Sequence, residues 1–389
     1  MTDTTPDDPF QDIRPYNDDE IRCVLDRLLT DPDFIRSIAQ FNFPRSHRFL
    51  PGAVHWLTRN RLAVQLKNVN SVATMQDVIA SYMDRMIERT TSALTHSGLE
   101  NLSPAQAHLF ISNHRDIAMD PAFVNYMLYH AGFDTLYIAI GDNLLKRPFV
   151  TDLMRLNKSF IVKRSLKGRE LLKSSKQLSD YIHHLVEHGK NVWIAQREGR
   201  AKDGLDKTET ALLKMLGMAR RSEGLAGSLK KLQIIPVSIS YEFDPCDGMK
   251  ADELFQKQTT GSYQKDEQSD INSIVTGVVG YKGHVHVAFG TELQPDTDDD
   301  EAIARLIDDQ VINNYRLQQT NMLAVLQLRA RNDAGYPEIS EEGELALAAF
   351  EADPAVADRF NQRIAALPAA IQPVALQMYA NPVLNRYRV

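Results

Sequence analysis

Short apolar runs alternate with longer amphipathic stretches through the middle of the chain. From about residue 105 the runs are brief and rich in β-branched and aromatic residues, which is typical of buried strands. They are AHLFIS (107–112), TLYIAIG (135–141), SFIVKR (159–164), NVWIAQ (191–196), LQIIPVSISY (232–241) and HVHVAFG (284–290). The stretches between them carry apolar residues at helical spacing, at 121–132, 148–157, 168–189 and 207–224. This alternation predicts an α/β fold with a largely parallel sheet flanked by helices.

The regions on either side of this core are predicted to be mostly helical. Residues 71–98 in particular are expected to form one long helix that stops at Gly98. The N-terminal residues are acidic and rich in proline, so they are expected to be disordered. The predicted parts are a tail (1–18), an N-terminal helical region (19–104), an α/β domain (105–295) with a polar, irregular insertion (244–282), and a helical C-terminal extension (296–389).

Composition limits the classes of function. The net charge of −7 argues against a nucleic-acid partner. The two cysteines imply no disulfide framework and fit a reducing compartment. The sequence starts without the basic and apolar stretches of a signal peptide, and no window approaches 18 uninterrupted apolar residues. We therefore expect a cytoplasmic protein whose membrane contact, if any, is peripheral at the cytoplasmic face of the inner membrane.

The first predicted strand of the core is followed by NHRDIAMD (113–120). His114 could act as a general base, because the pKa of histidine lies near neutrality. A carboxylate beside it would orient the imidazole, and Asp116 and Asp120 are both candidates for that role. Asp120 precedes Pro121 and an apolar stretch, so it also resembles a helix N-cap. Alternatively, these residues are simply the polar end of a strand and have no catalytic role.

Two basic clusters follow later strands of the predicted sheet, KRSLKGR (163–169) and REGRAKDG (197–204). The carboxyl ends of parallel strands are where such sheets usually bind ligands. Arginine offers a planar fork suited to phosphate, and lysine adds a mobile charge. In an acidic protein these clusters predict an anion site, with solvated loop charges as the alternative. Pro236 is unusual for a central strand, since it cannot donate to the ladder.

In this order, the clusters resemble the sequence blocks of the glycerolipid acyltransferase family, which includes the glycerol-3-phosphate and lysophosphatidate acyltransferases. NHRDIAMD is similar to the block Asn/Ser-His-Arg-Ser-x-x-Asp, FIVKR to Phe-Ile-x-Arg, REGRAKDG to Glu-Gly-x-Arg-Ser-x-x-Gly, and IIPVSISYE to an apolar strand with Val-Pro-Val-Ser. The resemblance covers about residues 105–242. Two departures stand out: five residues rather than four separate His114 from Asp120, and one residue is missing between Gly199 and Arg200.

The resemblance implies an O-acyltransferase. His114 would deprotonate a hydroxyl that attacks the thioester of acyl-CoA or acyl-carrier protein, and Asp120, or Asp116, would orient the imidazole. The acceptor would be a glycerol phosphate, with glycerol-3-phosphate favoured over 1-acylglycerol-3-phosphate, and no metal or other cofactor is implied. Backbone N–H groups of the helix near Pro121 are candidate donors to the oxyanion. The acceptor phosphate would be held by Lys163, Arg164, Arg200 and Lys202, and Glu198 and Gly199 would order their loop.

Other interpretations remain open. Residues 41–67 mix basic and aromatic residues, which suits a peripheral contact with anionic lipid or an ordinary polar connection. The altered spacings allow a non-catalytic acyl- or lipid-binding protein on a degraded acyltransferase scaffold. A metal-dependent hydrolase using His114, Asp116 and His286 is a further alternative.

Overall fold

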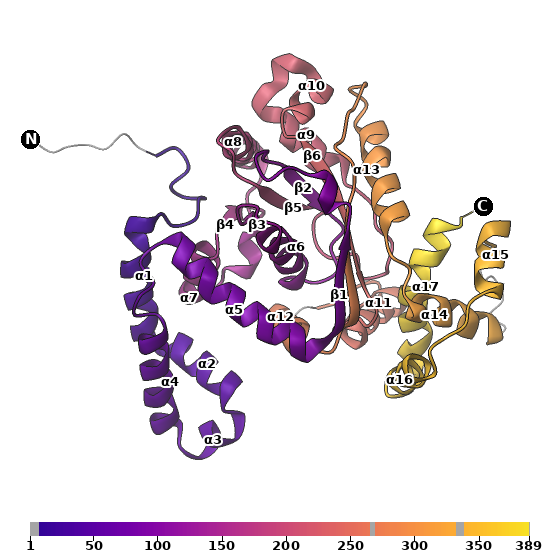
Figure 1. Ribbon diagram of the computed structural model, residues 1–389, viewed down its shortest axis with the longest axis horizontal. Coiled ribbons are helices and arrows are strands. Elements are labelled where there is room, and N and C mark those ends of the chain that lie inside the picture. The colour runs from indigo at the N-terminus through magenta and orange to yellow at the C-terminus, as the bar shows by residue number, and fades with distance from the viewer. Residues whose placement is uncertain (1–7, 265–268, 332–337, 389) are drawn as a thin grey trace, which may run out of the picture. The chain divides into compact units, whose positions relative to one another are not determined.

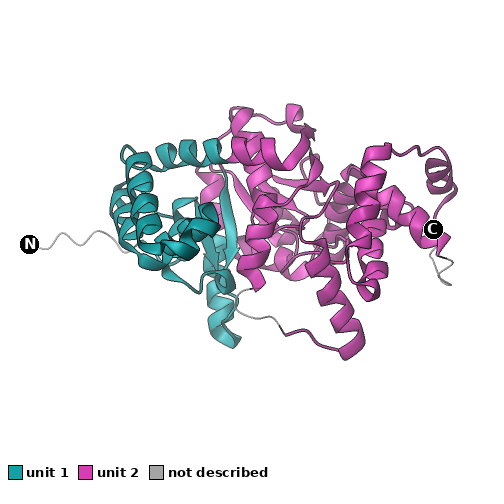
Figure 2. Cartoon of the chain, turned by 90° about the horizontal axis from the view of Figure 1, so that it is seen from below, with its two compact units in different colours: residues 1–82, 136–181 teal, residues 83–135, 182–389 magenta. Residues whose placement is uncertain are grey.

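The computed structural model describes residues 8–264, 269–331 and 338–388 (Figure 1). The chain forms two compact units, which Figure 2 shows in different colours. Unit 1 takes in the N-terminal residues as far as Tyr82 together with residues 136–181, and unit 2 takes in residues 83–135 and the remainder from Ile182. The predicted domain boundaries stay a prediction.

Unit 1 consists mainly of helices around one apolar core. Its helices are α1 (Asp18–Thr30), α2 (Pro32–Asn42), α3 (Pro44–Phe49), α4 (Pro51–Gln65), α7 (Pro148–Leu156) and the first parts of α5 (Val72–Thr90) and α8 (Gly168–Glu187). Two parallel strands, β3 (Tyr137–Gly141) and β4 (Ser159–Val162), complete the unit. Apolar side chains of α1, α2 and α7 form the core, among them Ile21, Leu25, Leu28, Phe34 and Leu156.

The predicted disordered tail is only partly described. Residues 1–7 lie outside the described residues. Residues 8–17 form turns, Ile13 is buried, and its carbonyl accepts a hydrogen bond from Ile161 N at 2.9 Å. The prediction of disorder is therefore wrong for residues 8–17, because Ile13 in this stretch is buried and its backbone is hydrogen-bonded to β4.

Unit 2 contains a sheet with the strand order β1-β7-β6-β2-β5. The strands are β1 (Thr91–Ser97), β2 (Leu109–Ser112), β5 (Val192–Ala195), β6 (Ile234–Tyr241) and β7 (Gly283–Phe289). All neighbouring pairs are parallel except β6 and β7. Every residue of β6 is buried, as expected for a central strand. The predicted α/β class with a largely parallel sheet and flanking helices is confirmed.

Helices of unit 2 follow the strands and build the C-terminal extension. They are α6 (Met119–His130), α9 (Thr210–Leu216), α10 (Gly224–Lys230), α11 (Asp247–Thr260), α12 (Ser269–Val279), α13 (Asp300–Asn314), α14 (Gln319–Ala330), α15 (Glu341–Ala348), α16 (Pro354–Ala365) and α17 (Gln372–Arg386). The extension is helical as predicted. It has its own apolar core, which Ala251 of α11 joins, and which includes Val325, Phe360, Leu376, Tyr379 and Val383.

Two predictions about these elements are wrong. Helix α5 ends at Thr90 rather than at Gly98, and residues 91–97 form β1, which pairs with β7. Pairing with a strand that lies far away in the sequence outweighs the weak helical pattern here. The insertion at 244–282 is not irregular, since α11 and α12 account for most of its described residues. Among the described residues, no helix is both long and apolar enough to span a bilayer.

We expect Gly98→Ala to destabilise the protein more than Gly132→Ala. Both glycines have a positive φ, of 78° and 83°, so alanine costs about 1–2 kcal/mol at either position. A Cβ at position 98 would also lie 2.0 Å from the backbone oxygen of Phe289, whereas a Cβ at position 132 meets nothing within 4 Å. Denaturant unfolding of both variants measures the difference. Equal losses of stability would contradict the close approach of β7 to Gly98.

Candidate active site

Asn113 fixes the chain where β2 ends. Its Nδ2 donates to the carbonyl of Ile239 at 3.0 Å, and its Oδ1 accepts from Ile239 N at 2.8 Å. The same Nδ2 also donates to Asp206 Oδ2 at 3.2 Å. The side chain is fully buried, so these bonds are protected from water. Asn113 therefore joins β2 to β6 directly before the loop that carries His114.

His114 is paired with Asp120. Its Nδ1 lies 2.9 Å from Asp120 Oδ2, and the ring packs edge-on against Trp193. Since a carboxylate only accepts hydrogen bonds, Nδ1 carries a proton and Nε2 is the basic nitrogen. The imidazole is partly exposed, whereas Asp120 is fully buried. This is the arrangement of a general base and its orienting carboxylate.

The Asp120 carboxylate receives three further donors. Its Oδ2 accepts from Arg115 N at 2.5 Å and from Asp116 N at 2.9 Å, and its Oδ1 accepts from Tyr241 OH at 2.6 Å. Burial, followed by the charge of Asp120, raises the pKa of Tyr241 well above its usual value, so the phenol keeps the proton that it donates. The turn closed by the two backbone amides accommodates the five residues between His114 and Asp120.

Asp116 accepts hydrogen bonds from the backbone at the start of helix α6, whose N-cap residue is Ala118. Its Oδ1 accepts from Ala118 N at 3.0 Å and from Met119 N at 2.9 Å. The interpretation of Asp120 as the N-cap is wrong, because α6 begins at Met119, two residues before Pro121, and Asp120 lies inside the helix. Burial and the charge of Asp120 raise the pKa of Asp116. Gly277 of α12 covers it closely: a Cβ there would lie 2.2 Å from Asp116 Oδ2.

The hydrogen bonds of Asp116 and Asp120 also bear on the predicted oxyanion donors. Backbone N–H groups of residues 115, 116, 118 and 119 already donate to Asp116 or Asp120, and Pro121 has no N–H. These four N–H groups are therefore not available to an oxyanion as the loop stands. The prediction that the start of α6 supplies oxyanion donors stays a prediction.

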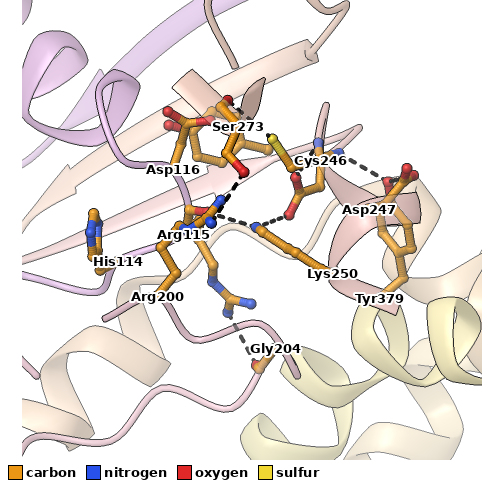
Figure 3. Close-up of polar contacts among 12 residues, drawn as sticks. His114, Arg115, Asp116, Arg200, Gly204, Cys246, Asp247, Lys250, Ser273 and Tyr379 are labelled. Atoms are coloured by element: carbon orange, nitrogen blue, oxygen red, sulfur yellow. Dashed lines mark hydrogen bonds and ion pairs between the residues drawn. The ribbon is translucent and has the colours of Figure 1, made fainter. Parts of the chain in front are cut away.

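The loop with Arg200 lies against the His114 loop. Ala201 N donates to the carbonyl of His114 at 2.8 Å, and Figure 3 shows His114 and Arg200 next to each other. Arg200 Nη2 lies 3.4 Å from Ser273 Oγ of α12, while its Nη1 is buried and has no hydrogen-bond partner among the described residues. A guanidinium with unused donors beside a candidate base is suited to an anionic substrate.

The other residues predicted to lie in this loop have different surroundings. Gly199 has φ 74°, a conformation that favours glycine. Glu198 is exposed, and its backbone N donates to Glu209 Oε2 at 3.2 Å. Lys202 forms an ion pair with Glu253 of α11. A phosphate would therefore have to compete with Glu253 for Lys202.

Lys163 and Arg164 belong to unit 1. Lys163 forms an ion pair with Asp12, and the backbone N of Arg164 donates to Asp142 Oδ1 at 3.2 Å. The predicted grouping of these two residues with Arg200 stays a prediction.

Buried ion pairs that sequence reasoning missed support the His114 loop. Arg115 Nη2 lies 2.6 Å from Asp206 Oδ2 and 3.1 Å from the carbonyl of Gly204. Lys250 Nζ donates to the carbonyl of Arg115 at 2.6 Å and is paired with Asp244 (Figure 3). Burial alone would lower the pKa of Arg115, but the charge of Asp206 raises it above its usual value. Arg115 is therefore charged and structural.

The C-terminal extension adds hydrogen bonds and an ion pair to this network. Tyr379 OH donates to Asp247 Oδ2 at 2.8 Å and accepts from Asp244 N at 2.9 Å. Arg363 holds the same Asp247 carboxylate. A cavity of about 30 Å³, with room for a water molecule or two, lies between the network and the extension. Its lining includes Arg115, Lys202, Tyr241, Asp244, Tyr315 and Tyr379.

The structure does not bring together the residues that a metal-dependent hydrolase would need. In the ranges that the structure describes, no three His, Cys, Asp or Glu side chains are arranged to hold a metal ion. Both ring nitrogens of His286 are engaged, Nδ1 with Thr95 Oγ1 at 2.7 Å and Nε2 with Ser97 Oγ at 3.0 Å. The set of His114, Asp116 and His286 required by a hydrolase is therefore not assembled.

Comparison with known proteins shows which family the segment around the site is similar to. Residues 93–240 match the model of the family described as Acyltransferase. The match includes His114, Asp120 and Arg200, and it confirms the resemblance for the part of the chain that it covers.

Two individual proteins show a weaker similarity to the chain. The chain is 28% identical over 169 residues to a glycerol-3-phosphate acyltransferase of Xanthomonas axonopodis pv. citri (strain 306), a match that covers 38% of this chain and 19% of that protein. The chain thus spans about a fifth of the length of this curated relative. The crystal structure of the 1-acyl-sn-glycerophosphate (LPA) acyltransferase PlsC from Thermotoga maritima aligns with 13% identity and a TM-score of 0.36, over 75% of this chain and 91% of that one.

The hydrogen bonds of Asp116 to the backbone at the start of α6 can be tested by stability. We expect Asp116→Ala to be less stable than Asp116→Asn by about 1 kcal/mol, because asparagine keeps an oxygen that accepts from both backbone amides. Denaturant unfolding of the two variants gives the difference. If the alanine variant matched the asparagine variant, the two hydrogen bonds of Asp116 would not stabilise the start of α6.

Proposed function

We propose that the protein transfers a fatty acyl group from acyl-CoA or acyl-carrier protein to a hydroxyl of a glycerol phosphate. The observation that carries the proposal is a partly exposed His114 whose Nδ1 is held by buried Asp120, beside an arginine with unused donors. The family match of residues 93–240 supports the reaction class. We expect the reaction in the cytoplasm, where both donors are found.

The proposed chemistry needs no covalent enzyme intermediate. His114 Nε2 accepts the proton of the acceptor hydroxyl while the hydroxyl oxygen attacks the thioester carbonyl carbon. The tetrahedral intermediate collapses with cleavage of the C–S bond, and the imidazolium returns its proton to the departing thiolate. The products are an ester and a free thiol. General-base catalysis of this kind typically contributes about 10²- to 10⁴-fold in rate.

Arg200 is the proposed anchor for the acceptor phosphate. Its buried Nη1 lacks a partner in the described part of the chain, and its contact to Ser273 Oγ at 3.4 Å is long enough to be exchanged easily. Lys163 and Arg164 are proposed to assist, together with Lys202 once Glu253 releases it. We favour glycerol-3-phosphate as acceptor, in line with the name of the relative at 28% identity, and 1-acylglycerol-3-phosphate next.

The reaction is tested by thiol release from acyl-CoA and acyl-carrier-protein donors, with and without each acceptor. We expect acceptor-dependent release that falls by about 10²-fold or more in His114→Ala. Asp120→Asn should lower kcat strongly, because asparagine presents a different set of donors and acceptors to the imidazole. Asp116→Asn, the matched control four residues away, should retain most activity. No release from folded protein that still binds acyl thioester would favour the non-catalytic scaffold.

Arg200→Gln tests the phosphate anchor. Loss of one charge-assisted hydrogen bond costs about 1.5–3 kcal/mol, so KM for glycerol-3-phosphate should rise roughly 10- to 100-fold. The rate with glycerol, which lacks the phosphate, should change little. Lys202→Gln serves as a comparison and should have a smaller effect, because Glu253 already pairs with Lys202. An unchanged preference for glycerol-3-phosphate over glycerol in Arg200→Gln would rule Arg200 out as the anchor.

A further inference from the structure

Tyr241 lies at the end of β6, where its side chain reaches the carboxylate that orients His114. The side chain is buried, and its hydroxyl donates to Asp120 Oδ1 at 2.6 Å. The centroid of its ring lies 5.9 Å from that of Phe123, three residues beyond Asp120 on α6. Phenylalanine could make the same ring contact, and a buried hydroxyl is costly unless it is hydrogen-bonded. The bond to Asp120 is thus what distinguishes tyrosine from phenylalanine at this position.

The phenol and the imidazole bind different oxygens of this one carboxylate. His114 Nδ1 lies 2.9 Å from Oδ2, which also accepts from two backbone amides, whereas Oδ1 accepts from Tyr241. The negative charge of a carboxylate is shared by its two oxygens, so a donor at Oδ1 withdraws charge from Oδ2. With less charge, Oδ2 binds the Nδ1 proton less strongly and stabilises an imidazolium less. The phenol therefore acts on His114 through Asp120.

We propose that Tyr241 is a positioning residue that limits how strongly Asp120 draws a second proton onto His114. This rests on the proposed function, in which His114 Nε2 must be free to accept the proton of the acceptor hydroxyl. A buried carboxylate beside an imidazole favours the imidazolium, which cannot act as a base. Sharing the charge of Asp120 with the phenol keeps the bond that orients the ring and leaves Nε2 able to accept a proton.

Several charged groups surround the carboxylate and the imidazole. The loop after β2 supplies Arg115 and Asp116, the loop after β5 supplies Arg200 and Asp206, and the segment after β6 supplies Asp244 and Lys250. Tyr241→Phe leaves all these charges in place. It also removes no charge itself, because burial raises the pKa of Tyr241 well above its usual value and keeps the phenol neutral. A change in pH dependence therefore reports the loss of one hydrogen bond.

The first test observes the imidazole without any substrate, by NMR of the full chain with labelled histidine. The chain has 11 histidines, and the signal of His114 is identified by its loss in His114→Ala. We expect Tyr241→Phe to move the Nδ1 proton of His114 downfield, because its hydrogen bond to a more highly charged Oδ2 becomes stronger. Uniform 3-fluorotyrosine, whose phenol is a stronger donor, should move the same signal upfield, which tests the proposal without a substitution at position 241.

The second test is the pH profile of acyl transfer to glycerol-3-phosphate. A more highly charged carboxylate favours the imidazolium, which must lose its proton before it can act as base, so the acidic limb of kcat/KM should lie at higher pH in Tyr241→Phe. At about pH 6 the variant should fall roughly threefold further below its high-pH plateau than the wild type. KM for glycerol-3-phosphate should change by less than about twofold, since the phenol acts on the base and not on the phosphate anchor.

Tyr16→Phe is the matched control. The Tyr16 hydroxyl donates to Asp152 Oδ1 at the same 2.6 Å, but in unit 1, so its loss should alter neither the His114 signal nor the pH profile. If Tyr241→Phe lost stability in denaturant unfolding but kept the wild-type signal and profile, Tyr241 would be purely structural and the proposal would be overturned. The expected signal shift in a protein without acyl transfer would support the role of Tyr241 and count against the proposed function alone.

Discussion

The Asp120 carboxylate is the interaction on which the candidate site depends. A buried charge is stable only when hydrogen bonds replace its hydration, and Asp120 receives donors from His114, Tyr241 and the backbone of Arg115 and Asp116. These bonds close the turn after β2, attach it to β6 through Tyr241, and hold the imidazole in one orientation. One buried group thus sets both the shape of the loop and the basic nitrogen of His114.

Polar and charged residues from later parts of the chain hold the loop after β2 in place. Lys250 of the insertion holds the carbonyl of Arg115, and Tyr379 of the extension holds Asp244 and Asp247, which flank the start of α11. Breaking one partner of a buried ion pair leaves an uncompensated charge, which is costly. The insertion and the C-terminal extension are therefore part of the framework of the site, although neither lies in the segment that matches the acyltransferase family.

The sequence predicted those features whose pattern lies within a few neighbouring residues, and it missed those that depend on contacts between distant residues. The strands of the core and the position of His114 were predicted correctly, because an apolar run followed by polar residues is visible within ten residues. β1 was missed because its partner, β7, lies nearly 200 residues away. The start of α6 was misplaced because Pro121 suggested the first helical position, whereas the helix begins at Met119. The pairing of Lys202 with Glu253 could not be predicted, since no local pattern connects the two.

The distribution of charge along the chain is uneven. Residues 34–76 carry only positive charge, so the rest of the chain is more acidic than the net value of −7 indicates.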